Sequence, residues 1–256
     1  MLDIENTKKA FQKYIQQFDV ADDKINLKLI HTYHVVETSK YICLHEGIEG
    51  EDYQLAMIIA LLHDIGRFEQ LKRYHSFNDE NIDHAKLGVN ILFNEKMIEY
   101  FVEDRKYDEI IKTAILYHSL YKIPSINNKQ ILLHCLLIRD SDKLDNFRVK
   151  NHASIKTLFD ISENEFLSLK VSDNIIENIK NHQLILKADR HNEVDMWVSY
   201  FAFVFDLHFS SSYQYLQETN YIARNMSRFH FTGKLKEQMD FVRDECIKYI
   251  EEKAEK

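Results

Sequence analysis

The segment Leu55-Ala-Met-Ile-Ile-Ala-Leu-Leu-His-Asp64 runs from a continuous apolar stretch into a histidine and an aspartate. We expect a helix here that begins near Asp52 and ends near Gly66, because glycine commonly terminates helices. A His-Asp pair alone carries little information in a chain rich in both residues. Here the pair follows a buried helix, and burying both groups without partners would be costly. A metal ion would satisfy both groups, and a buried His-Asp hydrogen bond without a metal is the alternative.

The rest of the chain also favours helices. It contains only one proline and five glycines among 256 residues, and these are too few to form the tight turns between many short strands. Upstream of the apolar segment, the residues Ile25, Leu29, Tyr33 and Val36 recur at the spacing of one helix face. Gly47 is a plausible end for that helix. The sequence therefore predicts an all-α fold.

Other helices follow from the same apolar spacing, and they are predicted at residues 4–18, 81–94, 106–119, 128–146, 173–182, 193–208, 211–227 and 234–253. The stretch 67–81 shows no periodicity and is predicted to be a loop that shapes a site. The more polar region 149–191 is expected to form short helices. No repeat or linker marks a boundary, so we expect a single all-helical domain over residues 1–256.

Composition excludes several function classes. A net charge of −8 and the absence of a long Lys/Arg block argue against binding of duplex nucleic acid, although one nucleotide in a pocket is compatible. The longest apolar runs fall far short of the ~20 residues that span a bilayer, which argues against a membrane protein. The polar opening segment does not resemble a signal peptide, and the three widely spaced cysteines are expected to be reduced. These features predict a cytoplasmic protein.

Several other predicted helices carry an imidazole or a carboxylate at an end or on an apolar side. His34 follows Tyr33, His84 lies early in its helix, and His118 ends another. Asp142 follows an apolar stretch, within the segment Arg139-Asp-Ser-Asp-Lys-Leu-Asp145. Neutral imidazole together with carboxylate is a ligand set that suits Fe, Mn, Zn, Co or Ni.

The order His34, His63-Asp64 and then Asp142 in an Asp-Lys-Leu sequence resembles the HD-domain superfamily of metal-dependent phosphohydrolases. The resemblance covers roughly residues 25–150. It implies an HD-domain helical bundle over this core, with residues 151–256 as additional C-terminal helices. It also implies that these four residues bind one divalent metal ion.

Two further histidines extend the resemblance. His84 and His118 fall where the two-metal members of the superfamily place additional ligands, which implies a second ion with Asp64 bridging the pair. The alternative is a solvent-facing histidine at each helix end, or a protonated histidine that binds substrate phosphate beside a single metal. The segments Leu62–Phe68, Phe77-Asn-Asp79 and Asp83-His-Ala85 also resemble a bacterial branch of HD-domain proteins.

Three neighbouring residues compete with the proposed ligands. His31 lies about one turn before His34, and the resemblance favours His34. Asp140 and Asp145 compete with Asp142. On a helix Asp140 and Asp142 point about 200° apart, so only one of the two can face the metal, and the resemblance selects Asp142.

The resemblance implies hydrolysis of a phosphate ester in a small phosphorylated compound, with a nucleotide as one candidate. Asp64, His84 and His118 would then take part in catalysis, and Arg67 and Lys143 would hold phosphate oxygens or orient a ligating carboxylate. The sequence contains no serine-nucleophile elbow and no phosphate-binding glycine loop. The alternatives are a diiron oxygenase on the same ligands and a non-catalytic binding module. The sequence does not indicate an oligomeric state.

Overall fold

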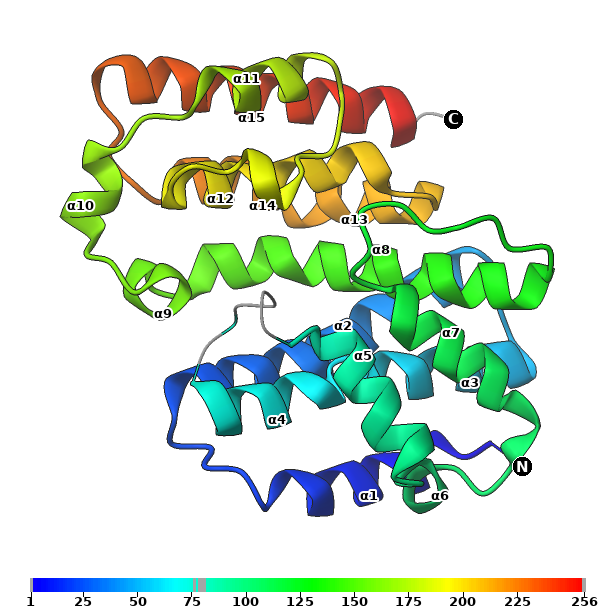
Figure 1. Ribbon diagram of the computed structural model, residues 1–256. Coiled ribbons are helices and arrows are strands. Elements are labelled where there is room, and N and C mark those ends of the chain that lie inside the picture. The colour runs from blue at the N-terminus through cyan, green and yellow to red at the C-terminus, as the bar shows by residue number, and fades with distance from the viewer. Residues whose placement is uncertain (1, 76, 78–81, 255–256) are drawn as a thin grey trace. The chain divides into compact units, whose positions relative to one another are not determined.

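The computed structural model describes residues 2–75, 77 and 82–254, and these residues form helices and connecting segments without a strand (Figure 1). The predicted all-α fold, with additional helices after the HD-like core, is therefore confirmed. The chain divides into two compact units, Met1–Asp142 and Lys143–Lys256. None of the helices among the described residues is long and apolar enough to cross a bilayer.

The first unit is built around α3, a helix that is buried from Leu55 to its end at Leu62. Its elements are α1 (Ile4–Ile15), α2 (Asp23–His45), α3 (Gly50–Leu62), α4 (Ile65–Tyr74), α5 (His84–Val89), η1 (Asn90–Asn94), α6 (Ile98–Phe101), η2 (Arg105–Tyr107), α7 (Asp108–Tyr117) and the first part of α8 (Lys129–His152). Every residue from Leu55 to Leu62 in α3 is buried, and α3 packs against α1, α2 and α7. The end of α3 therefore lies among several helices.

The predicted loop after the His-Asp pair is wrong in its first half. Residues Ile65–Tyr74 form helix α4, so Gly66 lies within a helix instead of ending one. The face formed by Ile65, Phe68 and Leu71 is buried at the three-residue spacing of a helix, and Phe68 contacts the ring of Phe11 at 6.1 Å between centroids. The end of the predicted loop includes residues 78–81, which lie outside the described residues, as does the start of the helix predicted at 81–94.

Helices α4 and α5 make an unusually close contact at two glycines. A Cβ atom on Gly66 would lie 2.1 Å from the carbonyl oxygen of His84 and 2.4 Å from the backbone nitrogen of Gly88. Only glycine permits this approach. The contact brings His84, at the start of α5, next to the His63-Asp64 pair that precedes α4.

The second unit contains the rest of α8, followed by α9 (Ile155–Phe159), α10 (Glu163–Ser168), α11 (Asp173–Lys180), η3 (Lys187–Asp189), α12 (Glu193–Ser199), η4 (Phe201–Asp206), α13 (Ser210–Thr219), α14 (Tyr221–Met226) and α15 (Gly233–Ala254). The short helices predicted for 149–191 are present. The predicted helix 193–208 becomes α12 and a 3-10 segment around the buried Trp197. The predicted helix 211–227 breaks at Asn220, whose φ of 51° is left-handed.

Candidate metal centre

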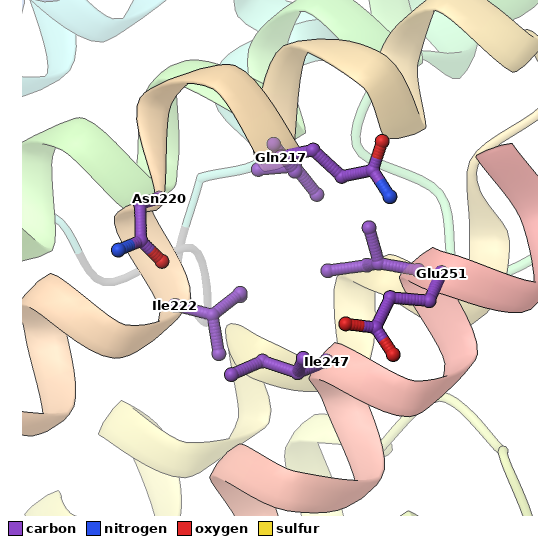
Figure 2. A pocket seen from close by; sticks show the side chains of 7 residues that line it. Gln217, Asn220, Ile222, Ile247 and Glu251 are labelled. Carbon is purple, nitrogen blue, oxygen red and sulfur yellow. The ribbon is translucent and has the colours of Figure 1, made fainter.

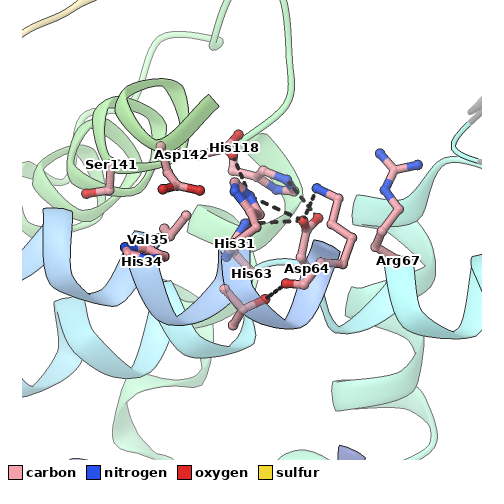
Figure 3. Close-up of polar contacts among 12 residues, drawn as sticks. His31, His34, Val35, His63, Asp64, Arg67, His118, Ser141 and Asp142 are labelled. Atoms are coloured by element: carbon pink, nitrogen blue, oxygen red, sulfur yellow. Dashed lines mark hydrogen bonds and ion pairs between the residues drawn. The ribbon is translucent and has the colours of Figure 1, made fainter. Parts of the chain in front are cut away.

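Four histidines surround the carboxylate of Asp64, which lies between α3 and α4. Figure 3 shows three of them, His31, His63 and His118, beside this carboxylate. Oδ2 of Asp64 is 3.5 Å from Nε2 of His63 and 3.7 Å from Nε2 of His31. Oδ1 is 3.4 Å from Nε2 of His84 and 3.9 Å from Nε2 of His118. Each oxygen therefore faces a different pair of imidazoles, and all five side chains are buried.

Asp142 completes one side of this cluster. Its Oδ1 lies 3.1 Å from Nε2 of His31, across the space between α8 and α2. The ligand atoms of His31, His63 and Asp142 all lie within 4.8 Å of one another, as do those of His63, Asp64 and His118. Bond lengths of about 2.0–2.2 Å allow one ion to join ligand atoms up to about 4.4 Å apart. The separations of 3.1–3.9 Å between these carboxylate oxygens and His31, His63 and His118 fall within that limit.

The orientations of two histidines match those of metal ligands. Nδ1 of His63 lies 2.7 Å from the carbonyl oxygen of Ala60, and Nδ1 of His118 lies 2.7 Å from that of Ile115. A carbonyl only accepts, so Nδ1 carries the proton in each ring and Nε2 presents a lone pair to the site. Among the described residues, the buried Nε2 of His63 has no hydrogen-bond partner. A metal ion would satisfy that nitrogen.

The ring of His84 has the opposite tautomer. Nη2 of Arg67 lies 2.6 Å from Nδ1 of His84, and a guanidinium only donates, so this Nδ1 accepts. The neutral ring then carries its proton on Nε2, which lies 3.1 Å from Nε2 of His118. In this tautomer Nε2 of His84 donates a hydrogen bond to Nε2 of His118 instead of presenting a lone pair. His63 belongs to both three-residue groups that could hold an ion, and His84 belongs to neither.

Lys28 is a functional candidate that sequence reasoning missed. It lies on α2 one turn before His31, and its Nζ is 2.6 Å from Oδ2 of Asp64. Its side chain is 19% exposed, whereas that of Asp64 is 2% exposed, so Lys28 lies at the solvent-facing side of the carboxylate. The sequence offered little signal for Lys28, because residues three apart, such as Lys28 and His31, are neighbours on a helix surface but differ by about 60° in direction.

The protonation states in the cluster are those that a divalent cation needs. Burial raises the pKa of Asp64, but the charge of Lys28 and the contacts with His63 outweigh it and hold this pKa well below its ordinary value. Burial opposes a similar lowering at Asp142, where the hydrogen bond and charge of His31 hold the pKa down. Burial, together with the charges of His84 and His63, lowers the pKa of His118 to about 3. At neutral pH both carboxylates are charged and His118 is neutral.

Residues 29–146 match the family model of the HD domain, and this segment contains the whole cluster around Asp64. Residues 29–146 are an HD domain. Proteins with this domain are generally metal-dependent phosphohydrolases. No curated protein and no solved structure matches the chain.

Within the HD domain, the structure replaces His34 with His31 as the histidine that α2 contributes to the cluster. His31 is 1% exposed and contacts Asp142, whereas His34 is exposed and lies apart from the residues around Asp64 (Figure 3). Three residues along a helix correspond to about 300°, so the two histidines differ by about 60° in direction. That difference is enough to turn His34 away from the buried face of α2.

The structure also gives Lys143 a different partner from the predicted phosphate. Its ammonium forms an ion pair with the carboxylate of Asp206 and donates to the carbonyl oxygen of that residue at 2.8 Å, within the second unit. Lys143 follows Asp142 directly on α8, and consecutive helical residues point about 100° apart, so the two side chains point in different directions.

The two carboxylates that compete with Asp142 have other surroundings. Asp145 pairs with Arg148, with Oδ2 to Nη2 at 2.9 Å. Asp140 is buried and belongs to neither group of residues that could hold an ion.

A cavity in the second unit offers different chemistry. It has a volume of about 260 Å³ and lies among α13, α14 and α15, with Ile222 and Ile247 on one side and Gln217, Asn220 and Glu251 around it (Figure 2). Its lining is mainly aliphatic, with two amides and one carboxylate. These groups do not provide the histidine and carboxylate set found around Asp64.

Proposed function

We propose that the HD domain of this chain binds one divalent metal ion through His31, His63, Asp64 and Asp142 and hydrolyses phosphate esters of small phosphorylated compounds. The observation that carries the proposal is that the ligand atoms of His31, His63 and Asp142 lie within 4.8 Å of one another, while Oδ2 of the buried Asp64 lies 3.5 Å from Nε2 of His63 and 3.7 Å from Nε2 of His31. A divalent ion in such a set supplies Lewis acidity and makes water a nucleophile near neutral pH.

Two cations in the site support a phosphorylated substrate. Arg67 is buried, and its guanidinium is fixed by contacts with His84, with the side-chain oxygen of Gln70 and with the carbonyl oxygen of Phe77 at 2.9 Å. Lys28 lies on the other side of Asp64 and is partly exposed. A planar guanidinium and a compact ammonium are both suited to phosphate oxygens. We assign phosphate binding to Lys28 and Arg67.

His84 supports a role in stabilising the leaving group. Arg67 holds its ring so that the proton is on Nε2, the nitrogen that faces Asp64 and His118. Hydrolysis of a phosphate ester converts the leaving oxygen into a hydroxyl group whose proton comes from the hydrolytic water, and a positioned N–H group stabilises the negative charge that develops on that oxygen. We assign His84 as the hydrogen-bond donor to this oxygen and His118 as the group that accepts the hydrogen bond of His84 before substrate binds.

The substrate is proposed to be a small molecule rather than duplex nucleic acid. The net charge of −8 opposes a long polyanion, whereas one or two phosphate groups can be matched by the local charges of Lys28 and Arg67. Nucleoside phosphates and sugar phosphates both meet this description.

The proposal is tested by measuring phosphate release from a panel of nucleoside phosphates and sugar phosphates, with Mn²⁺, Co²⁺, Fe²⁺, Ni²⁺ or Zn²⁺ added to metal-free protein. We expect release that requires one of these ions and is abolished in Asp64→Asn. Asp108→Asn, which removes a surface carboxylate paired with Arg105, is the matched control and should retain activity. Release that persists in Asp64→Asn, or no metal-dependent release with any compound, would contradict the proposal.

A further inference from the structure

Arg139 is a buried cation whose guanidinium contacts backbone carbonyl groups at the end of helix α7. It lies on α8, three residues before Asp142, and is only 2% exposed. Its Nη1 donates to the carbonyl oxygens of Tyr117 at 3.2 Å, His118 at 3.3 Å and Leu120 at 2.5 Å. One guanidinium nitrogen therefore contacts three carbonyl groups at the end of α7.

These carbonyl groups need a partner. The last carbonyls of a helix have no amide donor within the helix, and the helix dipole places partial negative charge on them. A buried arginine without compensation would itself be costly, so the contact satisfies both sides. Helix α7 ends at Tyr117, and His118 is its C-cap residue. The cation therefore fixes the turn of backbone that carries His118.

We propose that Arg139 is a positioning residue that sets the ring of His118 against His84 and ties both to the helix that carries Asp142. The ring of His118 is oriented through Nδ1 by the carbonyl of Ile115, one turn earlier in α7, and its Nε2 meets Nε2 of His84 at 3.1 Å. A shift of the turn after Tyr117 moves that acceptor relative to the proton of His84. The consequence for catalysis rests on the proposed function, whereas the effect on His118 does not.

The proposal is tested by nuclear magnetic resonance on metal-free protein labelled with ¹⁵N-histidine. In the wild type we expect the His118 ring to show one tautomer, with the proton on Nδ1. In Arg139→Met we expect the two ring-nitrogen signals of His118 to move toward each other as the tautomers mix. His63, whose ring makes the same type of bond at the end of α3, is the internal reference and should not change.

Two further variants keep the test decisive. Arg105→Gln removes an arginine at the other end of the α7 region, where it pairs with the partly exposed Asp108, and should leave the His118 signals unchanged. Arg139→Lys keeps the charge that α7 needs but loses the planar fork, so it should fold and still shift the His118 signals. Wild-type His118 signals in folded Arg139→Met, or in Arg139→Lys if the methionine variant does not fold, would overturn the proposal.

Activity provides a second, separate readout. If the proposed hydrolysis occurs, kcat of Arg139→Lys should fall by about tenfold, because small misplacements of catalytic groups are costly. A wild-type protein that binds no metal would end the proposed function but would leave the resonance test of Arg139 intact.

Discussion

The ammonium of Lys28 lies 2.6 Å from Oδ2 of Asp64, the carboxylate on which the histidine cluster is centred. This ion pair places a positive charge on the more accessible side of a buried negative group. A cation in this position lowers the pKa of Asp64, and in the proposed function it also binds the phosphate group of the substrate. Lys28 therefore acts on both the metal and the substrate in the proposed mechanism.

Replacing Lys28 with methionine should separate these two effects. We expect KM for a phosphorylated substrate to rise by about tenfold or more, because a charge-assisted hydrogen bond contributes roughly 1.5–3 kcal/mol. Metal affinity should be unchanged or stronger, since a positive charge next to a ligating carboxylate has been removed. Steady-state kinetics and a Co²⁺ titration measure the two quantities. Lys40→Met, an exposed position on the same helix, is the control. An unchanged KM in Lys28→Met would exclude Lys28 from substrate binding.

Gly66→Ala should destabilise the HD domain although alanine is the better helix former. A Cβ atom at this position would lie 2.1 Å from the carbonyl oxygen of His84, so α4 and α5 would have to separate. Overpacking of this kind costs about 3 kcal/mol, which exceeds the ~1 kcal/mol gained in helix propensity. Gly88→Ala should cost less, because its nearest contact would be 3.3 Å. Urea unfolding measures both, and equal stability of wild type and Gly66→Ala would contradict the close contact.

The stability of the first unit should depend on pH through His134. This residue is buried on α8, and its Nε2 lies 3.0 Å from Oδ1 of Asp52 on α3. Burial lowers the pKa of His134 despite this carboxylate, so the folded state favours the neutral ring. The unfolded chain takes up its proton near pH 6.5. Stability from this residue is therefore complete above about pH 6.5 and is lost as the pH falls toward the folded pKa.

His134→Gln removes this dependence. One group changes the free energy of unfolding by at most about 1.4 kcal/mol per pH unit, so the variant should lose less stability than the wild type between pH 6.5 and 5. Urea unfolding at several pH values gives both slopes. Parallel curves for the two proteins would show that His134 does not titrate on unfolding.

The sequence was sufficient to predict the all-α fold, because apolar residues recur at helical spacing and the chain has too few glycines and prolines for many short strands and tight turns. It did not reveal helix α4. The burial of Phe68 depends on contacts with Phe11 and Phe18, which lie 50 residues or more away in sequence, and the charged residues between the apolar ones hid the spacing. Local pattern alone could not supply those partners.

The sequence likewise predicted part of the candidate site and missed another part. The structure brings His63, Asp64, His118 and Asp142 together, as the sequence predicted, since each ends or interrupts an apolar helix. The choice between His31 and His34 needed a helix direction accurate to about 60°, which apolar spacing does not give. The role of Arg139 was also out of reach, because its carbonyl partners belong to a helix end about 20 residues earlier.

In the proposed site, His31 holds a divalent ion together with His63, Asp64 and Asp142. This ligand set is tested by measuring the metal content and Co²⁺ affinity of His31→Ala and His34→Ala beside the wild type. We predict one ion per chain in the wild type and in His34→Ala, and a loss of at least about a hundredfold in affinity in His31→Ala. A His31→Ala protein that binds metal as the wild type does, or a His34→Ala protein that loses its metal, would contradict the assignment of His31 as the ligand from α2.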